Sequence, residues 1–356
     1  MAVTTPQMIS FARGVPAPEC LAADDLAECA RAAVERDGKT ILSYGSGAGY
    51  APLRELLGEW FKVPASRIVL TNGSLNGFVL LAQQLGRGRS VLVEYPTYDR
   101  AIKILVESGA TVAAVAMDED GIVPEELENK LRLNPNPGFL YTIPTFQNPT
   151  GQTLSEPRRK LIVSLAEQQN LVLFEDDPYS LIRFEGEPLP ALFDLTDKKS
   201  IYSSSFSKTI APGLRVGWFI LPEELAVDLT EAATSSYITQ VLLAQATVHE
   251  FITRGLFEPN LQRINGLLKA RRDAMLSALD KYFSGATWTK PNGGFFTWVT
   301  LPEGTVAKDV IDRAEGVTAV AGPDFGGPAN TMRLAYSFVS PDEIETGVER
   351  LAAAID

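Results

Sequence analysis

The fold is decided by residues 171–220, which read LVLFEDDPYSLIRFEGEPLPALFDLTDKKSIYSSSFSKTIAPGLRVGWFI. Three runs rich in β-branched and aromatic residues, Leu171–Asp176, Ile201–Ser203 and Arg215–Ile220, predict buried strands. Between them lie segments rich in glycine, proline and polar residues, which are typical of turns. We therefore expect strands of one sheet, with polar side chains gathered where the strands end.

The same pattern continues upstream, where short strands alternate with amphipathic helical stretches. The expected strands are Arg67–Thr71, Ser90–Glu94, Thr111–Val115 and Phe139–Ile143. The expected helices are Ser74–Leu85, Thr97–Glu107, Pro124–Leu133 and Pro157–Gln169. Alternation of this kind predicts an α/β fold in which a mostly parallel sheet is covered by helices on both faces.

The pattern changes in the last third of the 356-residue chain. A long helical region, Pro222–Lys281, precedes expected strands at Gly294–Leu301, Val317–Ala321 and Met332–Ser337 and a closing helix, Pro341–Ile355. This arrangement predicts a smaller α+β domain that the N-terminal segment completes. We expect a large domain over residues 35–245 and a small domain made of residues 1–34 and 246–356.

The composition disfavours several classes of function. Lys and Arg number 32 and Asp and Glu 44, a net charge of −12, which argues against nucleic acid and anionic membranes as partners. The single histidine, His249, is expected to be structural or exposed, which disfavours a histidine-rich metal site and a Ser-His-Asp triad. Cys20 and Cys29, expected in one helical segment, suggest neither a disulfide framework nor a zinc site. Reduced thiols, without a signal peptide or a membrane-spanning run, indicate a cytoplasmic protein.

Polar residues follow several expected strands, and ligands of open parallel sheets bind beyond the carboxyl ends of the strands. Residues 72–75 (Asn-Gly-Ser-Leu) open a helix, where free backbone N–H groups either bind an anion or form a capping turn. Residues 95–98 place two tyrosines around a rigid turn, and the Asn-Pro of residues 148–149 is a common turn signal. The acids of residues 175–177 are more than a loop needs, and acids confined in a pocket need a cation.

Lys208 differs from the other lysines in its neighbours. Hydroxyl residues precede it, and Arg215 follows seven residues later at the start of an apolar strand. A lone lysine is usually solvated, but hydroxyls and an arginine beside it describe a phosphate site next to an amine. One cofactor needs a phosphate site, an aromatic partner for a flat ring, a carboxylate for a ring nitrogen and an amine for an aldehyde. Together these features point to pyridoxal 5'-phosphate (PLP).

The residues at these positions resemble those of fold-type I PLP-dependent enzymes, in particular the class I/II aminotransferases. Within that family they are most similar to the 2-aminoadipate, kynurenine and aromatic aminotransferase subgroup. The motifs occur in the family's order from about Ile9 to the end of the chain. They are Tyr44 with Gly49–Arg54, Gly73-Ser74, Glu94–Tyr98, Asn148–Gly151, Asp176–Tyr179, Ser205–Lys208, Pro212–Arg215, Pro291–Phe296 and Arg333–Ser337.

The resemblance implies a role for each matching residue. Lys208 would carry the cofactor as an imine and shuttle a proton, Asp176 would pair with the pyridine nitrogen, and Tyr98 would stack on the ring. Tyr179 and Asn148 would hydrogen-bond the phenolic oxygen, and Arg333, assisted by Asn148, would bind the substrate α-carboxylate. The phosphate would be held by Gly73, Ser74, Leu75, Ser205 and Arg215, together with Tyr44 of the partner subunit in a homodimer.

Three departures from the family pattern bear on the cofactor site and on substrate choice. Leu75 and Asn76 stand where relatives often have glutamines, so Leu75 offers only its backbone N–H. Arg13 stands in the substrate-covering segment where glycine is usual, and the chain begins only a few residues earlier. Arg13 either faces the distal carboxylate of glutamate or 2-aminoadipate or is a solvated loop arginine. Outside the site, we expect core positions for Tyr50, Trp218, Trp298 and Phe296 and a structural pairing for Arg54.

The resemblance implies an aminotransferase that moves an amino group from an L-amino acid to a 2-oxo acid such as 2-oxoglutarate. The donor would be aromatic, 2-aminoadipate-like or broad in range. One alternative is a PLP-dependent lyase, cyclase or oxidase of an amino acid, which the short N-terminus and Arg13 motivate. Another is a non-catalytic regulator that binds PLP, although the motifs begin almost at Met1 and leave no room for a DNA-binding module.

Overall fold

The large sheet of the protein has eight strands and is mostly parallel, as expected. In the computed structural model, which describes residues 8–355, the strand order is β2-β9-β8-β7-β6-β3-β4-β5. The strands are β2 (Ile68–Thr71), β3 (Ser90–Tyr95), β4 (Thr111–Asp118), β5 (Gly121–Ile122), β6 (Leu140–Thr142), β7 (Leu173–Asp176), β8 (Ile201–Ser205) and β9 (Gly217–Ile220). The central strands β3, β4, β6, β7 and β8 are parallel, whereas β9 is antiparallel to β2 and β8, and β5 is antiparallel to β4.

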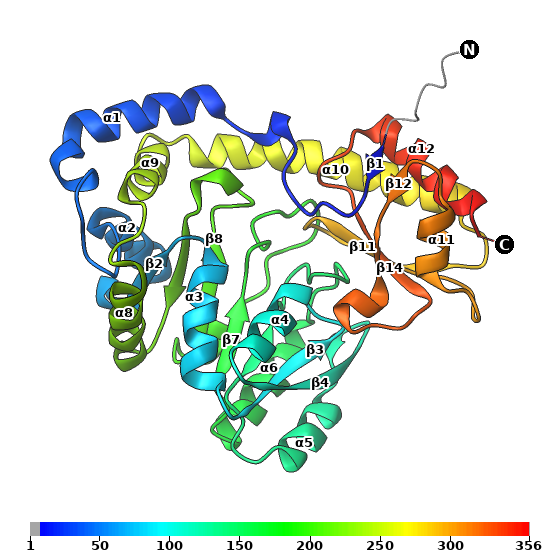
Figure 1. Ribbon diagram of the computed structural model, residues 1–356, viewed down its shortest axis with the longest axis horizontal. Coiled ribbons are helices and arrows are strands. Elements are labelled where there is room, and N and C mark those ends of the chain that lie inside the picture. Colours follow the sequence, from blue (N-terminus) through cyan, green and yellow to red (C-terminus); the bar gives the residue numbers. More distant parts are fainter. Residues whose placement is uncertain (1–7, 356) are drawn as a thin grey trace.

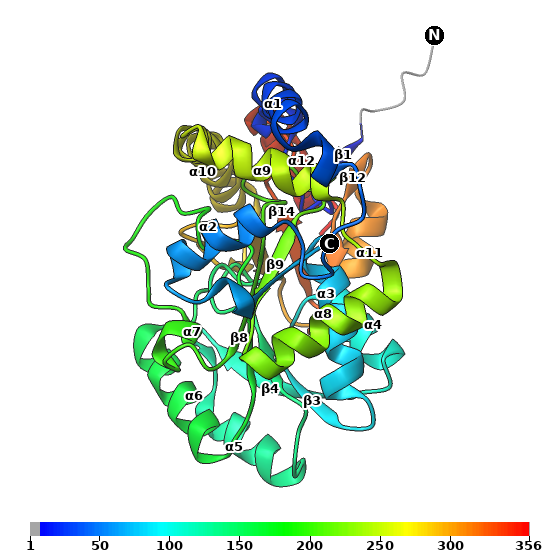
Figure 2. The same ribbon diagram turned by 90° about the vertical axis from the view of Figure 1, so that its left-hand side faces the viewer.

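Helices cover both faces of this sheet (Figures 1 and 2). Figure 2 shows α3 (Ser74–Leu81), α4 (Asp99–Glu107) and α8 (Glu223–Tyr237) on one side of the strands. The opposite side carries α2 (Ala51–Phe61), α6 (Glu156–Gln168) and α7 (Leu192–Leu195). Two further pairs complete the layers, since α5 (Pro124–Leu133) packs on β4 and α6, and α1 (Ala23–Ile41) packs on α9 (Leu242–Thr253).

The bounds of α5 show how local sequence sets a helix. Pro124 occupies its first turn, where its missing N–H costs nothing because that group has no partner inside the helix. Glu125 and Glu126 lie at the N-terminal end, and Lys130 and Arg132 lie in the last turn. These charges complement the helix dipole at both ends, which explains why the predicted range, Pro124–Leu133, is the observed one.

Side-chain alternation along the buried strands builds two separate apolar layers. On β6 and β7, Tyr141 and Phe174 share a core cluster with residues of α3 and α8. Their neighbours Leu140 and Leu173 belong to a different cluster, which contains residues of α5, α6 and α7. Because successive residues of a strand point to opposite faces, Asp176 follows Phe174 onto the α3 side. The acids on either side of it follow Leu173 onto the α6 side.

A smaller antiparallel sheet lies beside the large one, in the orange and red part of the chain in Figure 1. Its order is β10 (Thr287–Trp288), β11 (Phe296–Thr300), β14 (Thr331–Ala335) and β13 (Val320–Ala321). Helices α10 (Phe257–Tyr282) and α12 (Pro341–Ala353) pack on each other, and α11 (Ala307–Arg313) packs on β13 and β14. The N-terminal segment joins this part of the molecule, because β1 (Ile9–Ser10) pairs in parallel with β12 (Val317–Thr318).

The structure corrects several local predictions. The two cysteines do not share a helix: Cys20 ends a 3-10 turn that starts at Pro18, Leu21 is extended, and Cys29 lies in α1. The expected strand over 317–321 is split, because residues 317–318 pair with β1 and residues 320–321 pair with β14. Arg215 precedes β9 and adopts a left-handed backbone conformation with φ 54°. No helix within residues 8–355 is long and apolar enough to cross a membrane.

Candidate active site

A cavity of about 600 Å³ lies where the ends of the parallel strands face the small sheet. Its walls come from the N-terminus of α3, the segments after β6, β7 and β8, residues 12–15, and strands β11 and β14. The sequence-predicted site residues that line it are Arg13, Ser74, Leu75, Tyr98, Asn148, Asp176, Tyr179, Ser205, Lys208, Arg215 and Arg333. The structure therefore brings together residues that are more than 300 positions apart in the chain.

Lys208 reaches this cavity from the turn that follows β8. Its Nζ atom donates a hydrogen bond to the carbonyl oxygen of Gly14 at 3.0 Å. Burial, reinforced by the positive charges of Arg333 and Arg215, lowers the pKa of this amine to about 8. Only a neutral amine attacks an aldehyde, so a pKa in this range makes Lys208 a better nucleophile than a solvated lysine.

Asp176 ends β7 and lies in the same cavity. Its Oδ2 atom accepts a hydrogen bond from the hydroxyl of Tyr141 at 2.7 Å. Its Oδ1 atom is buried and has no hydrogen-bond partner within residues 8–355. Burial raises the pKa of Asp176 to about 6. A buried carboxylate oxygen without a donor fits a protonated ring nitrogen such as that of PLP.

The N-terminus of α3 and Arg215 together form a cradle for an anion. Gly73, with φ 82°, lies against Arg215, and a side chain at position 73 would collide with that guanidinium. The Arg215 side chain donates to the carbonyl oxygen of Asn72 at 3.3 Å. Ser74 and Leu75 begin the helix, where backbone N–H groups have no partner inside the helix. These groups fit a phosphate, and the Ser205 hydroxyl lines the same cavity.

Arg333 projects from β14 and is only 6% exposed. Its guanidinium lies between two rings, 4.4 Å from the centre of Phe296 and 4.7 Å from that of Phe325. It donates to the side-chain oxygen of Asn148 and to the carbonyl oxygen of Ala12, both at 2.8 Å. Within residues 8–355 it makes no ion pair with a carboxylate, and burial lowers its pKa. A held, unneutralised guanidinium of this kind is suited to bind the carboxylate of a substrate.

Two tyrosines complete the cavity beside Asn148. Burial raises the pKa of Tyr98 to about 12 and that of Tyr179 well above its usual range, so both phenols stay protonated at neutral pH. The Tyr179 ring packs edge-on against Phe296, with ring centres 5.7 Å apart. The geometry therefore provides a flat ring surface at Tyr98 and a hydroxyl donor at Tyr179.

Two predicted site residues, Arg13 and Tyr44, are exposed, and only Arg13 lines the cavity. Arg13 is exposed, lines the cavity and lies 4.6 Å above the centre of the Phe338 ring. Arg100, which was not among the predicted site residues, lines the same cavity and is also exposed. Tyr44 is 78% exposed and does not line the cavity of its own chain.

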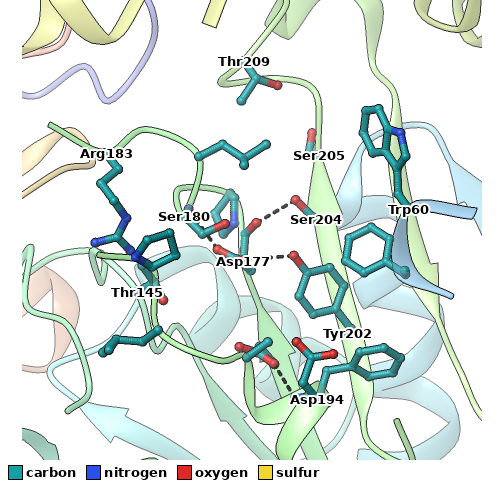
Figure 3. Close-up of a pocket in the computed structure, with 18 of the residues that line it drawn as sticks. Trp60, Thr145, Asp177, Ser180, Arg183, Asp194, Tyr202, Ser204, Ser205 and Thr209 are labelled. Carbon is teal, nitrogen blue, oxygen red and sulfur yellow. Dashed lines mark hydrogen bonds between the residues drawn. The ribbon is translucent and has the colours of Figure 1, made fainter. Parts of the chain in front are cut away.

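The three acids of residues 175–177 do not share one pocket. Figure 3 shows Asp177 in a second pocket of about 430 Å³ that Glu175 also lines. Its Oδ2 atom accepts from the Tyr202 hydroxyl at 2.8 Å, and its Oδ1 atom accepts from the Ser180 N–H at 3.0 Å. Asp176 alone lines the cavity that holds Lys208. The expectation that confined acids need a cation therefore applies to Asp176, whereas Asp177 is satisfied by uncharged donors.

Five residues outside the predicted site take the positions expected for them. Tyr50, Trp218, Trp298 and Phe296 are buried, as predicted, although Phe296 also lines the cavity. Arg54 donates to the carbonyl oxygens of Ile68 and Ala65, which is a structural pairing.

An amine of lowered pKa, an unpartnered carboxylate oxygen and an anion cradle at the strand ends of this α/β sheet define the fold-type I class of PLP-dependent enzymes. The chain belongs to the aminotransferase class I and II family, whose model matches residues 7–351. It is an amino-acid aminotransferase that uses PLP. The predicted family, fold and cofactor are thereby confirmed.

Named relatives cover almost all of the chain. It is 34% identical to aromatic-amino-acid aminotransferase 1 of Thermococcus litoralis, over 99% of this chain and 89% of that one. It matches the crystal structure of an α-aminoadipate aminotransferase of Thermus thermophilus bound to N-(5'-phosphopyridoxyl)-L-leucine, with a TM-score of 0.93, 36% identity and coverage of 98% and 92%. It also matches a kynurenine aminotransferase of Pyrococcus horikoshii in complex with PMP, with a TM-score of 0.93, 34% identity and coverage of 98% and 91%.

Sequence reasoning missed several residues of the site. Tyr141 lies in the middle of an apolar strand, so nothing in its neighbours distinguishes it from a core tyrosine. Ser207 lines the cavity and accepts a hydrogen bond from the hydroxyl of Ser205 at 2.8 Å. Phe325, the second ring beside Arg333, lies in a short 3-10 turn that no sequence pattern marked. Of these three residues, only Ser207 carries a sequence signal, because it directly precedes Lys208.

Proposed function

We propose that the enzyme takes its amino group from aromatic, 2-aminoadipate-like or more varied L-amino acids and passes it to a 2-oxo acid such as 2-oxoglutarate. The observation that carries this proposal is Arg333, whose held guanidinium offers paired donors to an α-carboxylate common to all these molecules. The names of the similar proteins, which include aromatic, α-aminoadipate and kynurenine aminotransferases, support this range of donors.

The proposed roles of the chain's residues follow from their positions. PLP, when bound, supplies an electron sink for the bonds at the substrate Cα. Lys208 would hold the cofactor, and its amine would be the base that moves the Cα proton, since burial lowers its pKa to about 8. Asp176 keeps a proton on the ring nitrogen. Arg333 and Asn148 orient the substrate through its α-carboxylate.

The remaining proposed contacts hold the cofactor in place. Tyr98 would stack on the ring, and Tyr179 and Asn148 would donate to its phenolic oxygen. The phosphate is bound by Gly73, Ser74, Leu75, Ser205 and Arg215, which surround the cradle at the start of α3.

We also propose a homodimer in which Tyr44 reaches the phosphate of the partner subunit. Tyr44 belongs to an exposed apolar group with Leu42, Ile238 and Val241, and the Gly45 N–H donates to Thr239, which joins the two segments. Exposed apolar side chains gathered in this way are typical of an interface. Sedimentation of the holoenzyme should give twice the chain mass, and Tyr44→Ala should weaken PLP binding.

The domain limits and the location in the cell stay proposals. Residues 35–245 hold the large sheet, and residues 246–356 with residues 1–34 hold the small sheets. Helices α1 and α9 run across these limits, so the two parts share helices. The buried, unpaired thiols of Cys20 and Cys29 support a cytoplasmic protein.

Arg13 is proposed to favour substrates with a second carboxylate. It lies exposed at the cavity, and no hydrogen bond or ion pair commits its guanidinium within residues 8–355. It can therefore turn toward a distal carboxylate such as that of glutamate or 2-aminoadipate without giving up a strong contact.

A panel of amino acids assayed with and without 2-oxo acids tests the proposal. An amino donor alone should bleach the visible absorbance of the holoenzyme, and a 2-oxo acid should restore it. Aromatic and acidic donors should be the most effective. Release of ammonia or peroxide without an acceptor, or no recovery with any common 2-oxo acid, would contradict the proposed transfer.

A further inference from the structure

Tyr141 touches the carboxylate that the cofactor ring is expected to meet, although it belongs to the core. It lies in the middle of β6, is 1% exposed and donates to Asp176 Oδ2 at 2.7 Å. In the register of β6 and β7, Tyr141 is opposite Phe174, so its hydroxyl reaches two residues further along the neighbouring strand. Rings of Phe78 and Phe174, with centres 5.0 and 5.6 Å away, hold the phenol in this direction.

We propose that Tyr141 is a positioning residue that orients Asp176 toward the PLP ring nitrogen and keeps it ionised. This inference rests on the proposed pairing of Asp176 with that nitrogen. Tyr141 occupies Oδ2, and the atom left without a partner within residues 8–355 is Oδ1. Because Tyr141 holds Oδ2, Oδ1 is the oxygen left to face the cofactor, and the hydrogen bond restrains the rotation of the carboxylate.

The charge of Asp176 needs this support because the site is buried. Burial raises the pKa of Asp176, and the hydrogen bond from Tyr141 is the main influence that opposes it. Burial also holds the pKa of Tyr141 well above its usual range, so its phenol remains a donor at every physiological pH. The other groups that act on Asp176 are Asp177, which raises its pKa, and Ser203 and Lys208, which lower it. Its titration in turn bears on Glu94, Tyr98 and Tyr179.

The chain contains a matched control for this interaction. Tyr202 on β8 is also a buried tyrosine, and it donates to the carboxylate of the next residue, Asp177, at 2.8 Å (Figure 3). Asp177 lines the second pocket and not the cavity of Lys208. Tyr141→Phe and Tyr202→Phe therefore each remove a hydroxyl that donates to a carboxylate from a buried tyrosine, and only Tyr141→Phe should affect the cofactor.

The test compares binding of two cofactors to the apoenzyme, measured by equilibrium dialysis. One is PLP, and the other is 1-deaza-PLP, in which carbon replaces the ring nitrogen. The wild-type protein should bind PLP at least about tenfold more tightly, because only PLP pairs with Asp176. Tyr141→Phe should reduce this preference about tenfold, with little loss for 1-deaza-PLP, and Tyr202→Phe should leave the preference within about twofold.

A pH series of the same measurement adds a second readout. Removing the Tyr141 donor raises the pKa of Asp176, so its protonation and the loss of PLP affinity on acidification should occur about one pH unit higher than in wild type. Thermal unfolding of both apo variants verifies that each is folded.

Each outcome decides between the claims. Equal binding of both cofactors by the wild type would remove the pairing of Asp176 with the ring nitrogen, and the role of Tyr141 with it. If Tyr141→Phe kept the wild-type preference for PLP over 1-deaza-PLP, the role of Tyr141 would be overturned and the pairing of Asp176 would stand. The same would follow if Tyr202→Phe lost as much of this preference as Tyr141→Phe. Neither of these last two results would affect the proposed amino transfer.

Discussion

The end of β7 separates two pockets that contain similar residues and differ in how those residues are paired. In the cavity of Lys208, the Asp176 carboxylate has one buried oxygen without a donor, and Arg333 has no carboxylate partner within residues 8–355. In the second pocket, both oxygens of Asp177 accept hydrogen bonds from neutral groups (Figure 3). The difference teaches that a buried charge with complete partners supports the fold, whereas one with an open position is available to a ligand.

Glu175 extends this contrast. It lines the second pocket, and burial, followed by the charge of Asp177, raises its pKa to about 8. Its Oε2 atom accepts from the Phe193 N–H at 2.8 Å, which ties β7 to α7. A carboxyl group that stays largely protonated at neutral pH and joins two elements of the fold is structural.

The largest expected effect comes from the two neighbouring aspartates. Asp176→Asn should lower turnover by about 10²- to 10³-fold, because an amide cannot hold a proton on the ring nitrogen. Asp177→Asn should keep turnover within a few-fold of wild type but lower the free energy of unfolding by about 1–3 kcal/mol, since one of its hydrogen bonds is lost. Steady-state kinetics and thermal unfolding of both variants measure the contrast. Comparable losses of turnover would erase the distinction between the pockets.

The next comparison concerns one arginine from each pocket. Arg333→Lys keeps the charge and removes the fork, so kcat/KM for the amino donor should fall about 10- to 100-fold. Arg183 lines the second pocket and lies 4.8 Å above the centre of the Phe146 ring. Arg183→Lys should change kcat/KM by less than about twofold. A similar loss in both variants would show that the α-carboxylate does not depend on Arg333 in particular.

A pH effect of moderate size distinguishes Lys208 from the solvated lysines. Its pKa is lowered to about 8, so the amine is mainly protonated below pH 8 and mainly neutral above it. The rate at which apoenzyme takes up PLP covalently should rise about tenfold per pH unit up to pH 8 and then level off. Stopped-flow absorbance between pH 6 and 10 follows this rate. A rate that still climbs above pH 10 would contradict the burial argument.

The smallest expected effect belongs to the exposed edge of the cavity. Arg13→Ala should lower kcat/KM for glutamate and 2-aminoadipate by about 3- to 10-fold, because the contact is solvent-screened. It should leave aromatic donors nearly unchanged. An equal loss for acidic and aromatic donors would show that Arg13 acts on the covering segment as a whole.

The sequence predicts the large sheet well because its strands carry strong local signals. Strands β2, β3, β6 and β7 each contain a run of buried apolar residues, and turn residues bound them on each side. The split of residues 317–321 into two strands could not be seen, because it depends on pairing with β1 and β14, which lie far away in the chain. The local sequence pattern predicts that a strand is present, but it does not predict which strand pairs with it.

The same limit applies to the candidate site. Lys208, Asp176 and Arg333 were found because they occur in recognisable motifs, and the structure brings them to one cavity. The family motif singled out Asp176, but composition and spacing alone could not separate it from its acidic neighbours, since that depends on which face of β7 each side chain takes. The sequence could not reveal Tyr141 either, because its contact with Asp176 depends on the pairing of β6 with β7, which sequence spacing does not show.

The central claim is that the open cavity holds PLP covalently on Lys208. Borohydride reduction of the holoenzyme, followed by digestion and peptide mass mapping, tests it most directly, with Lys208→Ala as the unlabelled control. We predict a pyridoxyl group on the peptide that contains Lys208 and on no other. A label on a different lysine, or none on fully loaded protein, would contradict the account.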